Sequence, residues 1–313
     1  MNNKDNFIMT PKIDFAFKLI FGDERNKEIL INFLSLVLNL PESEFRGIEI
    51  INTELPKEFE EDKKGILDVR IKTPEGKNID IEIQLAKTKY MPERSLFYWS
   101  KMYTLQIKSG DYYKKLKKCI AINIIDYEFL PFNEVHTKFH IFEDDLKYKL
   151  TDMLELHFLE LPKIEEYKKS NTTKDKILDW MEFLNADTKE AMEVLAKKNE
   201  NIGKAYKVLK KASLDERKRL AYESREAALM DERSRLFDAK EDGIAEGKIE
   251  GKIEGKIEAI LEILEDLDDV SEGLIKIVKK QTDLKRISEW LKIAARITKI
   301  KEFEEKIDFH NLK

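Results

Sequence analysis

Hydrophobic positions at the start of the chain recur with the spacing of helices. Apolar residues follow one another every three or four positions over residues 11–21, and Gly22 ends this pattern. A second pattern of the same kind covers residues 28–39 and stops before Pro41. Two helices are therefore predicted ahead of the first strand.

From Gly47 onward the period of the pattern changes from 3.6 to 2, which is typical of strands. The predicted order is three strands, a helix, a buried strand and two alternating segments expected to be edge strands: Ile48–Leu55, Ile66–Thr73, Asn78–Leu85, helix Pro92–Ser109, Lys117–Ile125, Thr137–Phe142 and Met153–Leu161. This order predicts an α/β fold in which helices flank one mixed central sheet.

After Pro162 the sequence contains only helical patterns and helix breakers. We therefore predict two domains, an α/β domain of residues 1–165 and an all-α region of residues 166–313. Trp180 and Trp290 lie in apolar helical surroundings and are interpreted as packing residues.

A short repeat, GKIEGKIEGKIE, lies in the helical region at residues 247–258. Each glycine costs about 1 kcal/mol relative to alanine inside a helix, and like charges recur four residues apart, so a lone helix is weak here. Glycines at every fourth position would let a second helix approach closely, which favours a homo-oligomer formed through the C-terminal helices. The alternative is a flexible charged linker.

The composition narrows the class of protein. Charged residues make up 38% of the chain, well above the usual share of about a quarter, which indicates extended solvated helices. The single cysteine, Cys119, excludes an internal disulfide framework and is interpreted as a core residue. Without an apolar leader or an apolar stretch long enough for a membrane span, we expect a cytoplasmic protein with no membrane contact. The net charge of -5 argues against non-specific coating of nucleic acid but permits a local basic patch.

A tight turn is predicted between the second and third strands. Pro74 and Gly76 are the first and last residues of a three-residue loop, which favours a type I turn followed by a left-handed residue. Counting back along both strands from this loop places Asp68 directly opposite Glu82. One face of the hairpin is then apolar and the other is polar, the polar face holding Asp68, Arg70, Lys72, Asn78, Asp80, Glu82 and Gln84.

Two carboxylates that face each other on adjacent strands repel unless a cation lies between them. Magnesium, with manganese as a substitute, suits this position because it takes oxygen ligands from one or two carboxylates and keeps waters for a substrate phosphate. Gln84 shares the polar face and is placed to orient an attacking water. The alternative is that this is the solvated face of a half-exposed sheet, with Arg70 and Lys72 beside the carboxylates.

Residues 10–125 resemble the PD-(D/E)XK nuclease family transposases, the Rpn group of recombination-promoting nucleases. The matching motifs follow one another in order: Asp14-Phe15-Ala16-Phe17-Lys18 with Phe21-Gly22, Leu67-Asp68-Val69, Ile81-Glu82-Ile83-Gln84, a helix with Arg94, Tyr98 and Tyr103, then Gly110-Asp111-Tyr112-Tyr113, and the apolar strand Cys119–Ile125.

The resemblance implies a restriction-endonuclease-like core and hydrolysis of DNA phosphodiester bonds by an endonuclease. It implies that Asp68 and Glu82 hold the catalytic metal and that Gln84 takes the third motif position, where the wider superfamily has lysine. It also implies a contribution to the site from Asp14 and Lys18 on the first helix, with Lys18 as a candidate DNA contact. The implied setting is recombination, mobile elements or defence against foreign DNA.

The helix after the hairpin carries basic residues at heptad spacing, namely Arg94, Lys101 and Lys108, with aromatic residues among them. This pattern predicts a surface that contacts DNA phosphates. The alternative is that the basic stripe is the solvated side of an amphipathic helix.

Two further points qualify the predicted function. Glutamine has an amide where lysine would add positive charge to the transition state, so Gln84 predicts weak or strongly metal-dependent cleavage. A catalytically inactive protein that acts as a DNA- or protein-binding scaffold is the alternative. His136 and His140 are four residues apart, but they fall in a strand-like segment without a carboxylate partner in a known pattern, so no metal-ligand role is predicted for them.

Overall fold

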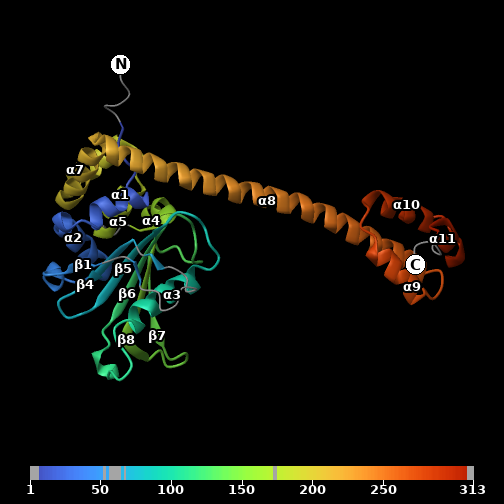
Figure 1. The fold of residues 1–313 in the computed structure, drawn as a ribbon, viewed down its shortest axis with the longest axis horizontal. Coiled ribbons are helices and arrows are strands. Elements are labelled where there is room, and N and C mark those ends of the chain that lie inside the picture. Colours follow the sequence, from blue (N-terminus) through green and yellow to red (C-terminus); the bar gives the residue numbers. More distant parts are fainter. Residues whose placement is uncertain (1–6, 52–53, 56–64, 67, 172–174, 309–313) are drawn as a thin grey trace, which may run out of the picture. The chain divides into compact units, whose positions relative to one another are not determined.

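A computed structural model describes residues 7–51, 54–55, 65–66, 68–171 and 175–308 (Figure 1). The chain forms two compact units, Met1–Leu229 and Met230–Lys313. Among the described residues, no helix combines the length and the apolar character needed to cross a membrane.

The first unit contains both the sheet and most of the helices. Its strands are β1 (Glu49–Ile51), β2 (Glu54–Leu55), β3 (Gly65–Ile66), β4 (Val69–Lys72), β5 (Asn78–Gln84), β6 (Cys119–Ile125), β7 (His136–Phe142) and β8 (Lys149–Glu160). Its α-helices are α1 (Asp14–Phe21), α2 (Lys27–Leu38), α3 (Met91–Thr104), α4 (Ile164–Ser170), α5 (Lys176–Asn185), α6 (Lys189–Lys198) and α7 (Glu200–Leu214).

Six of these strands form one mixed sheet in the order β1-β4-β5-β6-β8-β7, and β2 pairs with β3. Strands β5, β6 and β8 run parallel, and the outer pairs are antiparallel. The predicted mixed sheet flanked by helices is confirmed. The prediction of two edge strands is right for β7 and wrong for β8, which lies between β6 and β7, because the period of a strand does not show which strands will flank it.

The β4–β5 hairpin has the predicted turn. The backbone amide of Thr73 donates to the carbonyl of Lys77 at 2.9 Å, and Gly76 has a φ of 85°, in the left-handed region. Val69 pairs with Ile81 across the two strands. The register derived from the three-residue loop is therefore the one observed.

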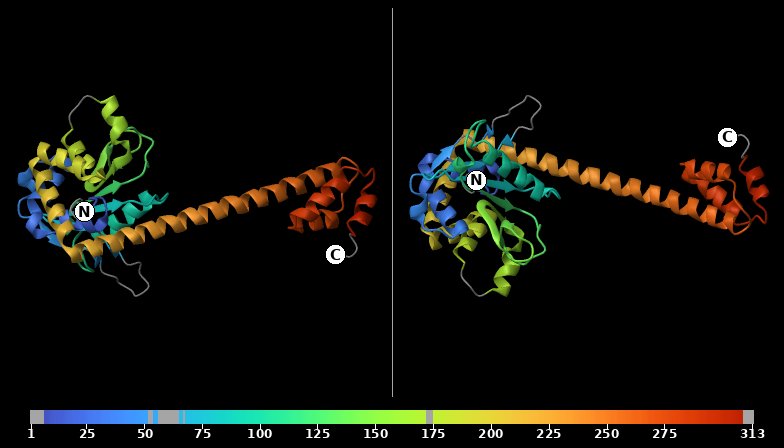
Figure 2. Two further views of the ribbon diagram at one scale, coloured as in Figure 1. Left: turned by 90° about the horizontal axis from the view of Figure 1, so that it is seen from above. Right: turned by 90° about the horizontal axis from the view of Figure 1, so that it is seen from below.

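The sheet of the first unit has helices on both of its faces, and β6 lies in its interior (Figure 1; Figure 2 gives two further views). The odd and even positions of β6 face different neighbours. Ile120, Ile122 and Ile124 belong to the core that includes α1, α2, α5 and α7. On the opposite face the Ser95 hydroxyl of α3 donates to Asn123 at 3.0 Å, and Cys119 packs with Tyr98 and Met102 of α3.

Helix α3 therefore covers the polar face of the hairpin. Asn78, Asp80 and Glu82 are at most 5% exposed. The interpretation of this face as the solvated side of a sheet is wrong for these three residues, although Lys72 is exposed. The pattern of polar residues here marks a buried polar layer, and such a layer needs internal partners for its charges.

Cys119 is fully buried beneath α3, as predicted for a core residue. Burial raises the pKa of its thiol to about 12, and its sulfur accepts a hydrogen bond from Nε2 of Gln106 at 3.1 Å.

The helices after residue 166 contribute to the same core as the sheet. Trp180 of α5 is fully buried, with its ring centroid 5.5 Å from that of Phe21 and 5.8 Å from that of Phe33. Its indole nitrogen donates to Oδ1 of Asn32 at 3.0 Å. The boundary between the two compact units thus lies between residues 229 and 230. The predicted boundary between two functional domains, at residues 165 and 166, stays a prediction.

Helix α8 (Glu216–Glu265) begins in the first unit and ends in the second, where α9 (Glu272–Lys280), α10 (Leu284–Ala294) and α11 (Ile300–Lys306) follow. The second unit has its own apolar core, which includes Ile260, Leu264, Leu274 and Trp290. The glycine repeat is helical throughout, so the interpretation as a flexible linker is wrong. The predicted helical C-terminal region is therefore confirmed.

Candidate active site

The hairpin brings Asp68 and Glu82 together. Asp68 directly precedes β4, whose first residue, Val69, pairs with Ile81, the neighbour of Glu82 on β5. The backbone amide of Asp68 donates to Oε1 of Glu82 at 3.2 Å. In return, the amide of Ile83 donates to Oδ2 of Asp68 at 3.0 Å. The two carboxylates are therefore held by each other's strands.

A cation from a flanking helix contacts each of the two carboxylates. Nζ of Lys18, on α1, lies 3.0 Å from Oδ1 of Asp68. The guanidinium of Arg94, on α3, donates to Oε2 of Glu82 at 3.1 Å. Helices from the two layers thus supply positive charge to one acidic pair, and such charge-assisted contacts fix side chains more firmly than neutral ones.

The carboxylates lie in a strongly perturbed electrostatic environment. Burial raises the pKa of Glu82 to about 7, and the nearby charge of Asp68 adds to the shift. Burial also raises the pKa of Asp80 well above its ordinary value, with Glu82 and Asp68 as further causes. Burial lowers the pKa of the Arg94 guanidinium, but the charges of Glu82, Tyr98 and Asp68 and the hydrogen bond to Glu82 together raise it above its ordinary value. Clusters of groups with such shifts are enriched at functional sites.

Gln84 lies close to this pair along its strand, whereas Asp14 contacts another part of the chain. Gln84 is two residues from Glu82 on the same strand, and its Nε2 donates to the carbonyl of Ala86 at 3.0 Å. Asp14, in the first turn of α1, accepts a hydrogen bond from Nε of Arg225 at 2.8 Å. Among the described residues, no contact of Asp14 with Asp68 or Glu82 is found. The role implied for Asp14 in the site stays a prediction.

Besides Lys18, three basic residues after the hairpin were predicted to contact DNA, and they do not form one helical stripe. Arg94 points to Glu82 and is partly buried, and Nζ of Lys101 lies 5.9 Å from the ring centroid of Phe97. Lys108 lies beyond Thr104, where α3 ends. Placing Lys108 on the same helix face was wrong, because the chain leaves the helix in a turn before residue 108. DNA contact by the three residues stays a prediction.

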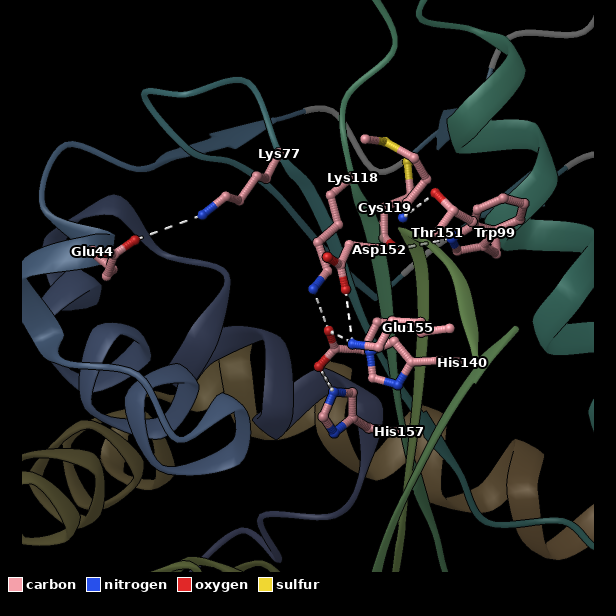
Figure 3. Close-up of polar contacts among 12 residues, drawn as sticks. Glu44, Lys77, Trp99, Lys118, Cys119, His140, Thr151, Asp152, Glu155 and His157 are labelled. Carbon is pink, nitrogen blue, oxygen red and sulfur yellow. Dashed lines mark hydrogen bonds and ion pairs between the residues drawn. The ribbon is translucent and has the colours of Figure 1, made fainter. Parts of the chain in front are cut away.

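A second polar cluster, on β7 and β8, was missed at the level of sequence (Figure 3). His157 and His140 each contact one oxygen of Glu155, at 2.7 and 3.2 Å, and Lys118 forms an ion pair with it. Although burial raises the pKa of Glu155, its hydrogen bonds with His157 and Lys118 hold that pKa well below its ordinary value. His136 completes the chain of contacts through Nδ1 of His157 at 2.8 Å.

The only sequence signal for this cluster was the even spacing of His136 and His140, which places both on one face of a strand. Their partners come from another strand, so the contacts depend on tertiary structure. The cluster attaches the edge strand to the sheet by polar contacts.

The acidic pair offers two carboxylates, a ligand set that suits a divalent cation. Among the described residues, no group of three or more histidine, cysteine, aspartate and glutamate side chains is placed to hold a metal ion. Asp68 and Glu82 provide two carboxylates, and magnesium in nucleotide-processing sites is commonly held by one or two carboxylates with waters and phosphate oxygens. A divalent cation would also offset the repulsion that contributes to the raised pKa of Glu82.

A six-stranded mixed sheet between helices, with Asp68 in contact with Glu82, is consistent with a nuclease-like class of fold. A sequence model of the PD-(D/E)XK nuclease family transposases matches residues 11–239. The chain therefore belongs to this family. Searches of curated proteins and of solved structures found no match.

The raised pKa of Glu82 predicts a specific dependence of stability on pH in the absence of metal. Its ordinary value is 4.5 and the folded value is about 7, so folding favours the protonated carboxyl. This contribution is complete below pH 4.5 and is lost as the pH rises through 7. Between about pH 5.5 and 8.5 we expect the wild type to lose about 2 kcal/mol more unfolding free energy than Glu82→Gln.

Urea unfolding in EDTA at the two pH values measures this difference. Glu165→Gln is the control, because the Glu165 side chain is 78% exposed. Equal pH dependence in the wild type and Glu82→Gln would show that Glu82 titrates normally.

Proposed function

We propose that this protein is a metal-dependent endonuclease that hydrolyses phosphodiester bonds in DNA. Membership of a nuclease family supports a nuclease-related function. The observation that carries the proposal is the contact of Asp68 with Glu82, in which the amide of one residue donates to the carboxylate of the other at 3.2 Å. This contact brings Asp68 next to the Glu82 carboxylate, which supports a metal ion shared by the two side chains.

In the proposed site Asp68 and Glu82 hold magnesium, or manganese in its place. Such an ion, when bound, polarises the scissile phosphate and lowers the pKa of water. The amide nitrogen of Gln84 is engaged by the carbonyl of Ala86, which orients the side chain and leaves its carbonyl oxygen as an acceptor for a proton of the attacking water.

Positive charge at the site comes from the helices. The amide of Gln84 adds no charge, whereas Lys18 and Arg94 lie within 3.1 Å of the carboxylates. The Lys18 side chain is 38% exposed, so it is accessible to a phosphate oxygen of DNA. We assign Lys18 and Arg94 to charge stabilisation of the phosphate, which requires positive groups close to the reacting atoms.

A specific observation also supports the alternative function, a catalytically silent scaffold that binds DNA or protein. Lys18 and Arg94 already neutralise the two carboxylates, as a cation would. Incubation of purified protein with supercoiled plasmid and magnesium discriminates between the two functions. An open-circular product whose formation EDTA prevents supports the endonuclease, and intact plasmid at all magnesium concentrations supports the scaffold.

We assign the protein to DNA recombination, to mobile elements or to defence against foreign DNA, and we place it in the cytoplasm. The recombination, mobile-element and defence settings follow from the family, whereas the cytoplasmic location is the expectation drawn from the sequence. The proposed substrate in each setting is DNA.

We further propose that the protein forms a homo-oligomer through α8. A Cβ added at Gly243, Gly247, Gly251 or Gly255 meets nothing within 4 Å in the described chain. Ile244, near the start of this row, is 49% exposed. A row of glycines beside an exposed apolar residue supports close approach of a second helix, because the backbones can then come into contact.

Substitution of the row tests this assembly. We expect the double variant Gly247→Ala/Gly251→Ala to weaken self-association by about 1–3 kcal/mol, because the added methyl groups overpack the contact. Sedimentation at several protein concentrations measures the effect, with Ser234→Ala, an exposed position on the same helix, as the control. A wild-type mass of a single chain at every concentration, or a variant that self-associates as tightly as the wild type, contradicts the assembly.

A further inference from the structure

A pocket of about 460 Å³ lies where the end of β5 meets the start of α3, beside the acidic pair. Its lining includes Gln84, Tyr90, Glu93, Arg94, Phe97 and Tyr98. This volume is within the range of small-ligand sites, which is roughly 300–1,000 Å³. Figure 1 shows the position of α3 next to the sheet.

Aromatic side chains dominate the exposed part of the lining. Tyr90 is 58% exposed and Phe97 is 37% exposed. Phe97 contacts Tyr98 edge to face, with ring centroids 5.4 Å apart, while Tyr98 itself is buried. Two large aromatic rings at the mouth of a pocket cost free energy in water and gain it when a flat ligand stacks on them.

Each of the three rings also has a cation next to it. Nζ of Lys89 lies 5.0 Å from the ring centroid of Tyr90, and the Arg94 guanidinium lies 4.8 Å from that of Tyr98. Lys101 lies 5.9 Å from the ring centroid of Phe97. Aromatic rings interleaved with basic side chains form the kind of surface that binds single-stranded nucleic acid, because rings stack on bases and cations contact phosphates.

The pocket and the acidic pair share residues. Arg94 lines the pocket and donates to Glu82 at 3.1 Å, and Gln84 lines the pocket two residues from Glu82. Arg94 therefore links the pocket to the Glu82 carboxylate. Glu93, a further lining residue, provides an acceptor for the amino group of a base.

We propose that this pocket holds one unpaired nucleobase of the DNA strand whose phosphate lies at Asp68 and Glu82. The inference rests on the proposed nuclease function and adds a substrate class to it, namely DNA with an unpaired nucleotide next to the scissile phosphate. The base stacks on Phe97 and Tyr90, and Lys89 and Lys101 contact the flanking phosphates. A paired base inside a duplex cannot enter the pocket without leaving its stack.

Binding without cleavage tests the pocket. The full chain is titrated in EDTA into a fluorescent single-stranded oligonucleotide, and into a strand of equal length whose central nucleotides are abasic. Both strands carry the same phosphates, so the ratio of their dissociation constants isolates the bases. We expect the wild type to bind the strand with bases about 10-fold more tightly, as stacking of a base on an aromatic side chain contributes that order of affinity.

Variants of the rings then locate the effect. Phe97→Leu is expected to reduce the ratio toward one, and Phe97→Tyr is expected to retain it, because only stacking distinguishes the two variants. Phe142→Ala is the matched control, since Phe142 is 45% exposed and lies on β7, away from the lining. The proposal would be overturned if the wild type bound both strands equally. It would also be overturned if the leucine, tyrosine and control variants all lost the preference for the strand with bases to the same extent.

The test separates the two proposals. Base-dependent binding in EDTA without magnesium-dependent nicking would retain the pocket and reject the endonuclease. Nicking together with equal binding of the two strands would retain the endonuclease and reject the pocket.

Discussion

Asp68→Ala and Glu82→Ala are each expected to lower the rate of magnesium-dependent plasmid nicking by about 100-fold or more. Each substitution removes one of two carboxylates that lie within hydrogen-bond reach of each other's strands. It also leaves a cation without its partner, Lys18 in the first variant and Arg94 in the second. The rate of appearance of open-circular plasmid measures the loss at a fixed magnesium concentration.

Two controls make this result interpretable. Asp152→Ala removes a carboxylate whose side chain is 70% exposed on β8 and is expected to nick at the wild-type rate. Circular dichroism and the urea midpoint of each variant show whether the fold is retained. If both active-site variants are folded and nick as fast as the wild type, the endonuclease is rejected and any nuclease activity comes from elsewhere in the preparation.

A chain shortened to residues 1–165 is expected to lose cooperative unfolding, whereas a chain of residues 1–239 is expected to keep it. The shorter chain lacks the fully buried Trp180, which packs on Phe21 and Phe33. It also lacks the buried Tyr222 of α8, whose hydroxyl accepts a hydrogen bond from the amide of Thr10 at 3.2 Å. Urea unfolding followed by tryptophan fluorescence and circular dichroism distinguishes the two chains.

A single substitution in the full chain tests whether Trp180 stabilises the first unit. Trp180→Ala is expected to lower the free energy of unfolding by about 3–5 kcal/mol, as is usual when a large buried ring is removed. Trp290→Ala, in the core of the second unit, is the matched control. A chain of residues 1–165 that unfolds cooperatively would show that the sheet and its first helices suffice for folding and would support the predicted division at residue 165.

The hairpin was predictable because its rules are local. Proline and glycine in fixed positions of a short loop determine the turn, the turn determines the register, and strand alternation then assigns each side chain to a face. The pairing of Asp68 with Glu82 follows from these steps alone. Membership of the family was likewise accessible from the order of short motifs.

Features that depend on distant parts of the chain were not predictable in this way. Asp80 and Glu82 are buried because α3 covers the polar face of the hairpin. No pattern in the sequence indicates this packing. The contact of Asp14 with Arg225 joins residues 211 positions apart. The interior place of β8 and the contacts of Glu155 also arise only when strands from separate segments meet.

The burial of Cys119 has a practical consequence for experiments on this chain. A thiol reacts as the thiolate, and here burial raises the pKa to about 12 while α3 covers the sulfur. Alkylating reagents should therefore modify the folded protein only during excursions that lift α3 from the sheet. The rate at which Cys119 is alkylated therefore measures how often α3, the helix that carries Arg94, moves away from the sheet. No cysteine has to be introduced for this measurement.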